Sequence, residues 1–177
     1  MNLRPPESGE YAPYYGRYIS LVPGEDIVRE LESQHVQTME LLAGHTDREG
    51  DFRYAPDKWS LNQVVGHITD TERIFAYRAL RIGRGDQTPI EGFEQDDYAR
   101  DASFNQRSLA DLAAEFSAVR EATLALFRSL AEEAWSRRGI ASKNEVSVRA
   151  LAYIIAGHEL HHRKILQERY FSPIRPA

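Results

Sequence analysis

The stretch WSLNQVVGHITDTERIFAYRALRIG, residues 59–83, carries the clearest helix signal in the sequence. Ser60 is a favourable N-cap, and Gln63, three residues later, completes a capping box. Apolar residues then recur at helical spacing until Gly83, a residue type that commonly follows the end of a helix. We therefore predict an amphipathic helix over residues 60–83.

Three further segments outside this helix show the same apolar periodicity. They cover residues 24–43, 108–135 and 147–170, and Ser108 and Ser147 are the N-caps of the last two. No segment between the helices has a convincing strand pattern. Because four amphipathic helices bury their apolar stripes best against one another, we predict an all-α, four-helix bundle.

Length and composition limit the class of protein. A chain of 177 residues with 42% hydrophobic and 28% charged residues fits one soluble domain over residues 1–177. Its net charge of -5 disfavours binding to nucleic acid, which needs a basic face. The sequence has no membrane-spanning apolar run and no signal peptide at its start, so we expect a cytoplasmic protein. It has no cysteine, which excludes disulfides and cysteine nucleophiles.

Two segments are unusual for a simple bundle. Residues 1–23 contain the tyrosine-rich run YAPYYGRY, and we expect an extended arm that lies across the bundle or a partner subunit. Residues 84–107 form an acidic connection that is long for a compact domain, so it is either functional or required by the topology. Residues 137–149 are locally basic, and we interpret them as a solvated connector.

His158 and His162 are four residues apart on the apolar face of the last helix. Two imidazoles in this arrangement can bind one metal ion from the same side. The alternative is a pair of core histidines that hydrogen bonds satisfy. Burial of both rings in an apolar stripe favours the metal, because each ring carries a donor and an acceptor that need partners.

The third ligand should come from another helix at the same height, and His67 is the candidate. His67 lies roughly 10 Å from the start of its helix and His162 roughly 10 Å from the end of its own, so the levels agree if these helices are antiparallel. The helix between them must then run parallel to the one containing His67, which requires residues 84–107 to cross the whole bundle. This predicts up-down-down-up topology. His35 is better explained as a structural residue or as a partner of a ligand.

Two motifs together resemble a known family. KWSLNQVVGHITDTERIF (residues 58–75), followed later by AGHELHHRKIL (residues 156–166), resembles the DinB-like superfamily of bacterial four-helix bundles. YISLVPGEDI near the N-terminus and YAPDKWS before the second helix are also similar to that family. The resemblance implies up-down-down-up topology, a frequent homodimer, and a divalent metal held by His67, His158 and His162. Its characterised relatives include bacillithiol- and mycothiol-dependent S-transferases and isomerases.

Three neutral imidazoles leave a metal ion with an open coordination position, as in catalytic sites. Nitrogen ligands suit Zn²⁺ or Ni²⁺ best, with Mn²⁺ and Fe²⁺ as further candidates. Since the chain has no cysteine, a sulfur nucleophile must arrive on a low-molecular-weight thiol. The leading hypothesis is a metal-dependent enzyme that acts on a small-molecule substrate, such as a thiol-dependent S-transferase. The alternatives are a hydrolase that uses metal-bound water and a non-catalytic metal-binding or assembly bundle. The sequence identifies no catalytic residue beyond the metal ligands.

Overall fold

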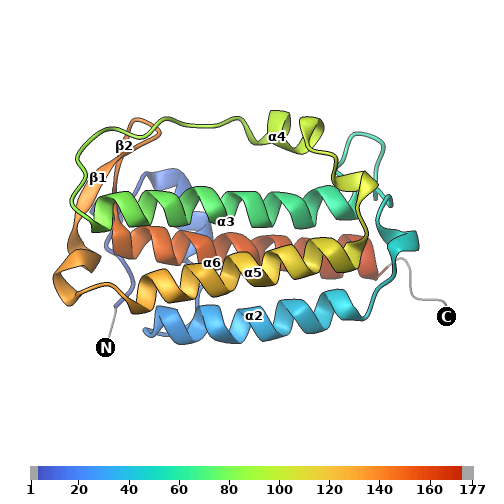
Figure 1. Cartoon of the computed structure of the whole chain (residues 1–177), viewed down its shortest axis with the longest axis horizontal. Coiled ribbons are helices and arrows are strands. Elements are labelled where there is room, and N and C mark those ends of the chain that lie inside the picture. The colour runs from blue at the N-terminus through green and yellow to red at the C-terminus, as the bar shows by residue number, and fades with distance from the viewer. Residues whose placement is uncertain (1–3, 173–177) are drawn as a thin grey trace.

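The structure, a computed structural model, describes residues 4–172 and is dominated by four long helices (Figure 1). They are α2 (Ile27–Ala43), α3 (Leu61–Gly83), α5 (Leu109–Arg128) and α6 (Val148–Ile165), which continues into a π-helical turn over Leu166–Phe171. Helices α2 and α3 each pack against both α5 and α6. The predicted four-helix bundle is therefore confirmed.

Serine side chains cap three of these helices. The Ser60 hydroxyl accepts a hydrogen bond from the Gln63 amide at 3.1 Å, and the Gln63 side chain accepts one from the Ser60 amide at 3.0 Å. Ser108 and Ser147 accept hydrogen bonds from amides three residues further on, at 3.0 Å and 2.9 Å. These bonds satisfy amide groups that have no partner inside the helix.

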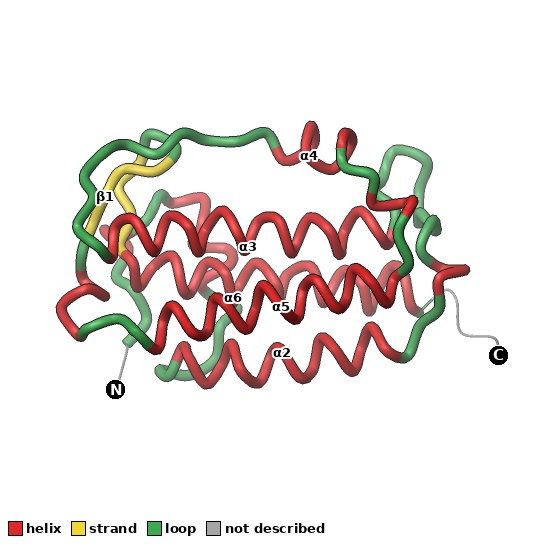
Figure 2. The backbone as a smooth tube through the Cα atoms, viewed as in Figure 1, coloured by secondary structure: helices red, strands yellow, loops and turns green. Residues whose placement is uncertain are grey.

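The helices run in the up-down-down-up order. Figure 1 shows α2 and α6 running in one direction and α3 and α5 in the other. After α3, residues 84–107 return along the whole bundle and include α4 (Gln95–Asp101), as the tube in Figure 2 shows. The predicted topology and its long crossover are confirmed.

The sequence did not predict a β-hairpin, and the expectation that no strand occurs between the helices is wrong. Strands β1 (Arg138–Ala141) and β2 (Asn144–Ser147) pair antiparallel where we had expected a solvated connector. The turn residues Ser142 and Lys143 have φ values of 51° and 67°, which is the left-handed conformation that two-residue hairpin turns require. Neither residue is the glycine or asparagine that normally reveals such a turn.

Two helix boundaries also differ from the prediction. Helix α5 ends at Arg128 rather than at residue 135, and Glu132–Ser136 form a separate 3₁₀ turn. Helix α2 begins at Ile27 rather than at residue 24, because the Asp26 side chain caps the Arg29 amide at 3.1 Å.

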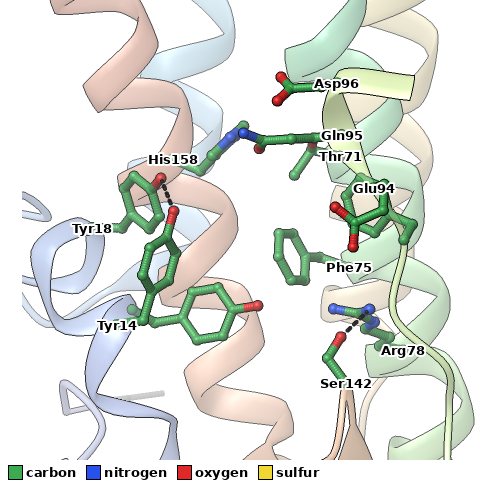
Figure 3. Close-up of a pocket in the computed structure, with 12 residues that line it drawn as sticks. Tyr14, Tyr18, Thr71, Phe75, Arg78, Glu94, Gln95, Asp96, Ser142 and His158 are labelled. Carbon is green, nitrogen blue, oxygen red and sulfur yellow. Dashed lines mark hydrogen bonds between the residues drawn. The ribbon is translucent and has the colours of Figure 1, made fainter. Parts of the chain in front are cut away.

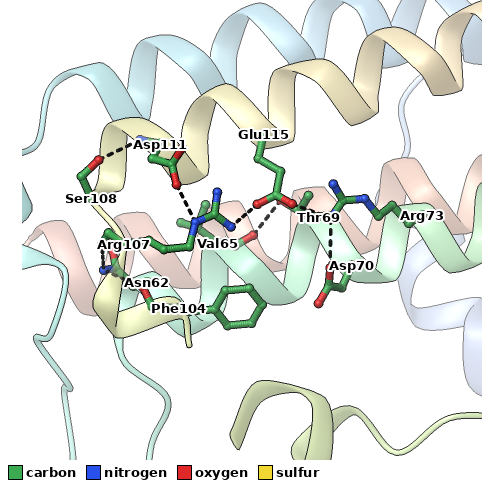
Figure 4. A network of polar contacts seen from close by, with 10 residues as sticks. All are labelled: Asn62, Val65, Thr69, Asp70, Arg73, Phe104, Arg107, Ser108, Asp111 and Glu115. Atoms are coloured by element: carbon green, nitrogen blue, oxygen red, sulfur yellow. Dashed lines mark hydrogen bonds and ion pairs between the residues drawn. The ribbon is translucent and has the colours of Figure 1, made fainter. Parts of the chain in front are cut away.

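Hydrogen bonds attach the crossover to the rest of the fold along its length, including near both of its ends. Near its start, the Ile90 amide donates to the Ile140 carbonyl of β1 at 2.9 Å. At its end, the Asn62 side chain on α3 donates to the Arg107 carbonyl at 3.0 Å (Figure 4). Arg107 in turn pairs with Glu115 on α5, which also pairs with Arg73 of α3 at 2.7 Å. The crossover therefore has a defined path over one side of the bundle.

The N-terminal arm is not extended as expected. Residues 1–3 lie outside the described residues, and the rest forms 3₁₀ turns at Ser8–Glu10 and Pro13–Tyr15 and the short helix α1 (Gly16–Ile19). This helix packs on α6 at Gly157, where a Cβ atom would lie 2.1 Å from the Tyr18 carbonyl oxygen. A glycine is therefore needed for this close approach.

A polar layer divides the core at mid-height. One apolar cluster contains Phe75 and Ile155 and lies towards the hairpin, and the other contains Val64 and Leu166 and lies towards the opposite end. Between them, buried histidine, glutamate and arginine side chains occupy the interior. No helix within residues 4–172 is long and apolar enough to span a membrane.

Candidate metal centre

Three histidines that are distant in sequence meet in this polar layer. His67 comes from α3, and His158 and His162 lie one turn apart on α6. The Nε2 atoms of His67 and His158 are 3.1 Å apart, and one ring nitrogen from each of the three histidines lies within 4.8 Å of the others. The antiparallel course of α3 and α6 brings them to one level, as the argument from helix heights requires.

Burial keeps these imidazoles neutral at physiological pH. His67 and His158 are 4% and 6% exposed. Burial lowers the pKa of His67 to about 4. Burial, together with repulsion from the neighbouring histidines, lowers the pKa of His158 and His162 well below the usual value of 6.5. Neutral imidazole is the form that ligates a metal ion.

Hydrogen bonds leave part of this cluster unsatisfied. His67 Nδ1 lies 3.4 Å from the Thr71 hydroxyl. The enclosed Nδ1 atom of His162 has no hydrogen-bond partner among the described residues. An unpaired buried polar atom lowers the stability of the fold by about 1–3 kcal/mol. Hydrogen bonding alone therefore does not explain why these histidines are in the interior. Three converging neutral imidazoles, one of which keeps an unpartnered ring nitrogen, fit a divalent cation of the kind that imidazole prefers.

Two cavities reach the cluster. The first, of about 290 Å³, includes His158 in its wall, and the second, of about 310 Å³, includes His162. Trp59 and Tyr170 line the second cavity, and Asp96 on α4 lines both. The crossover thus supplies a carboxylate to the two spaces beside the histidines.

The first cavity is bordered by the arm, helix α3 and the crossover (Figure 3). The Tyr18 ring lies edge-on to His158 with 5.4 Å between the ring centroids, and the Tyr18 and Tyr14 hydroxyls are 3.3 Å apart. Burial and the contact with Tyr14 raise the pKa of Tyr18, so its hydroxyl stays protonated. The arm therefore contributes hydrogen-bond donors as well as aromatic walls.

His35 does not join the cluster. Its Nε2 atom lies 2.8 Å from the Ser117 hydroxyl, and its ring lies edge-on to Phe116. This fits the structural role that the sequence favoured. Glu72, also on α3, is buried and pairs with Arg120 of α5 at 2.7 Å.

Several residues around the cluster were missed by the sequence analysis. Thr71, Phe75 and Arg78 line the first cavity from α3. They follow His67 by four, eight and eleven residues, which places them on one helical face, so a helical wheel centred on His67 could have found them. Asp96 and the arm tyrosines carry no such signal, because the paths of the crossover and arm are not periodic.

Known proteins are similar to this chain in sequence or in structure. A protein of Oceanobacillus iheyensis named "Putative metal-dependent hydrolase OB0413" is 26% identical over 146 residues, which cover 78% of this chain and 82% of that protein. The structure of Bacillus subtilis YfiT, described as a "probable metal-dependent hydrolase with an unusual four-helix bundle topology", matches with a TM-score of 0.69 at 17% identity, over 94% of this chain and 91% of YfiT. A mycothiol-dependent maleylpyruvate isomerase matches with a TM-score of 0.67 at 11% identity, over 82% of this chain and 61% of the isomerase.

The family model gives the assignment. It is the model of the DinB superfamily, and it matches residues 30–166, well over half of the chain. The matched region includes both histidine-bearing helices and the crossover between α3 and α5. The chain belongs to the DinB superfamily.

Proposed function

We propose that His67, His158 and His162 bind one divalent cation and that the protein is a metal-dependent enzyme acting on small molecules. The observation that carries this proposal is the convergence of three neutral imidazoles within 4.8 Å, with His67 and His158 buried and His162 partly buried. Cavities of about 290 and 310 Å³ beside them suit a small organic substrate. The names of the Oceanobacillus iheyensis relative and of YfiT agree with this proposal.

Three histidine ligands leave the cation open to a further ligand. When bound, the cation supplies Lewis acidity and lowers the pKa of a water or thiol that reaches it. Nitrogen donors favour Zn²⁺ or Ni²⁺ over Mn²⁺ and Fe²⁺. A fully closed structural site would need a fourth protein ligand, which the histidine cluster within residues 4–172 does not include.

Side chains that line the cavities can accept protons or donate hydrogen bonds. Asp96 lines both cavities, so its carboxylate is placed to accept a proton from water or a thiol in either one. The protonated Tyr18 hydroxyl can donate a hydrogen bond to a substrate oxygen. Aromatic rings from the arm and from α3 supply apolar surface in the wall of the first cavity. We propose hydrolysis as the first candidate reaction.

Thiol-dependent transfer is the second candidate, and one observation favours it. The sequence has no cysteine, so a sulfur nucleophile would have to be part of a small-molecule thiol, and a thiol-dependent isomerase shares the fold. A non-catalytic metal-binding bundle is the outcome if turnover does not depend on the histidines.

We also propose that the protein is a homodimer. Sedimentation equilibrium would measure its oligomeric state.

Metal analysis tests the site. Untagged protein, purified without chelator, is analysed by mass spectrometry for bound metals. We expect close to one equivalent of a divalent metal in the wild type and in His35→Ala, whose histidine lies outside the cluster. We expect its loss in His67→Ala. A wild-type protein without metal, even after incubation with Zn²⁺ or Ni²⁺, would overturn the proposal.

Turnover separates the candidate reactions. Metal-loaded protein is assayed with chromogenic esters alone, and with a small thiol plus monochlorobimane. Ester cleavage supports hydrolysis, and conjugation supports thiol transfer. Both reactions should slow in Asp96→Asn but not in Asp97→Asn, a neighbour on α4 that pairs with Arg100. Turnover that is unchanged in His158→Ala would contradict an enzymatic role of the cluster.

A further inference from the structure

Arg78 is a buried cation in the wall of the first cavity, and the proposed reaction does not use it. Its side chain comes from α3, and the residue is only 2% exposed. Within residues 4–172, no carboxylate pairs with it. Arg120 on α5 is also deeply buried, but it pairs with two glutamates.

The groups that contact Arg78 are neutral. Its Nη2 atom donates to the Ser142 hydroxyl at 2.9 Å and to the Glu91 carbonyl at 3.2 Å. Its guanidinium carbon lies 5.2 Å from the Phe75 ring centroid and 6.0 Å from that of Phe93. Its buried Nε atom has no hydrogen-bond partner among the described residues.

An arginine in this position retains its positive charge. Burial lowers the pKa of Arg78, but a guanidinium does not lose its proton at physiological pH. Removal of a charge from water is costly unless an opposite charge or strong hydrogen bonds compensate for it. Aromatic faces and neutral hydrogen-bond partners, the Tyr15 side chain included, compensate only partly, so an anionic ligand in the cavity would bind favourably to Arg78.

We propose that Arg78 binds the carboxylate of the substrate, and that the substrate is a small monocarboxylic acid with an apolar or aromatic body. This inference rests on the proposed function, because it assigns the substrate class of the same site. A planar guanidinium matches a carboxylate in geometry. Glu94 and Asp96 line the same cavity, so a phosphate dianion would meet more repulsion there than a carboxylate.

Arg78 and His158 lie apart in the wall of the first cavity, so a ligand could contact both. Arg78 follows His67 by eleven residues on the same face of α3, which corresponds to roughly 16 Å along the helix axis. Figure 3 shows Phe75 between Thr71 and Arg78, with His158 at the end away from Arg78. A carboxylate on Arg78 would thus place an apolar body along Phe75 and Phe93, and a reactive group near the histidines.

Arg78 also holds structure together, and this alternative is testable. Its bonds to Ser142 and to the Glu91 carbonyl join α3 to the hairpin turn and to the crossover. A purely structural role would make a variant less stable but would create no preference for charged over neutral ligands. The preference itself is therefore the informative measurement.

The test compares 5-phenylpentanoate with the neutral 5-phenylpentanamide by isothermal titration calorimetry. It uses the full chain without metal, so that the carboxylate cannot act on a cation, and repeats the measurement after Zn²⁺ loading. A charge-assisted pair predicts that the wild type binds the acid at least about tenfold more tightly than the amide. Equal affinities, or no binding of the acid at millimolar concentration, would overturn the proposal without any variant.

Variants then locate the preference. Arg78→Gln should lose it, Arg78→Lys should retain part of it, and Arg84→Gln, at the exposed end of α3, should retain all of it. A preference that persists in folded Arg78→Gln contradicts the assignment. Tighter binding of 4-phenylbutyl phosphate than of the acid would overturn the choice of a carboxylate.

The outcomes separate this inference from the proposed function. If the wild type binds no metal but prefers the acid, the metal-dependent function fails and the anion site remains. If metal binds stoichiometrically and the acid has no advantage, the function stands and Arg78 is structural. Arg78→Gln should retain the metal content of the wild type in either case.

Discussion

Each residue of the histidine cluster links the stability of the metal-free protein to pH. The folded-state pKa of His67, about 4, lies below the unfolded value of about 6.5. The unfolded chain therefore takes up the proton first as the pH falls. The contribution of His67 to stability is complete above pH 6.5 and is lost as the pH falls towards 4. His158 and His162 act in the same direction.

We predict that the free energy of unfolding of the metal-free protein falls steeply below pH 6.5. A histidine that is protonated only in the unfolded state contributes roughly 1.4 kcal/mol per pH unit. Urea unfolding of the wild type and His67→Gln between pH 7.5 and 5 measures this effect, and the variant should lose less stability over that interval. Equal losses in the two proteins would show that His67 titrates normally.

A buried ion cluster at Arg120 connects the four long helices. Arg120 on α5 binds both oxygens of Glu72 on α3, at 2.8 and 2.7 Å, and one oxygen of Glu159 on α6 at 2.6 Å. From α2, the Leu31 carbonyl accepts from Arg120 at 3.1 Å, and the Thr38 hydroxyl donates to Glu159 at 2.5 Å. The cluster fixes the relative height of the helices next to the histidines.

We predict that Arg120→Leu lowers the free energy of unfolding by about 3–5 kcal/mol, because it leaves two buried carboxylates without a cation. Arg128→Leu is the matched control on the same helix, since its ion pair with Glu32 is exposed. We expect that variant to lose less than about 1 kcal/mol. Urea denaturation at pH 7 measures both. Similar small losses would mean that the buried cluster does not stabilise the bundle.

Among the elements, the contact between α1 and α6 depends on Gly157. An alanine usually stabilises a helix by about 1 kcal/mol relative to glycine. At position 157 its Cβ atom would meet the Tyr18 backbone, which cannot rotate away. We predict that Gly157→Ala loses about 1–3 kcal/mol and displaces Tyr14 and Tyr18 from the first cavity. Urea denaturation and near-ultraviolet circular dichroism measure these effects. Gly9→Ala is the control, because a Cβ atom there has no atom within 4 Å, and a similar loss in both variants would contradict this explanation.

Elements with local signals were predictable from the sequence. Serine caps and apolar periodicity located the starts of three long helices, because those signals act within a few residues. The hairpin at 138–147 was not predictable in this way, since its turn uses Ser142 and Lys143 at positive φ. The arm and α4 depend on contacts with α6 and α3, which lie far away in sequence.

At the scale of the whole molecule, the topology explains why part of the site was predictable. The requirement that His67 and His162 reach one level, combined with the long 84–107 segment, selected one helix order, and the structure has that order. The cavity walls could not be inferred in the same way. They come from the arm and crossover, whose paths follow from packing against helices that must first be assembled.

Because of this topology, a metal ion that binds all three histidines should stabilise the folded state. His67 and His158 are 91 positions apart in sequence, so the complete site exists only when α3 and α6 are packed. A ligand that binds only the folded state at 100 times its dissociation constant adds about 2.7 kcal/mol of stability. Binding of Zn²⁺ to the local pair His158 and His162 in the unfolded chain would reduce this gain.

We predict that Zn²⁺ raises the thermal midpoint of the metal-free wild type and that EDTA reverses the rise. In His67→Ala, the local pair on α6 is available to the folded and unfolded chains alike, so Zn²⁺ should shift the midpoint little. Mg²⁺ prefers oxygen ligands and should have no effect on either protein. Differential scanning calorimetry measures these shifts. An equal rise in both proteins would mean that Zn²⁺ binds without the contribution of α3, and the three-histidine site would then be wrong.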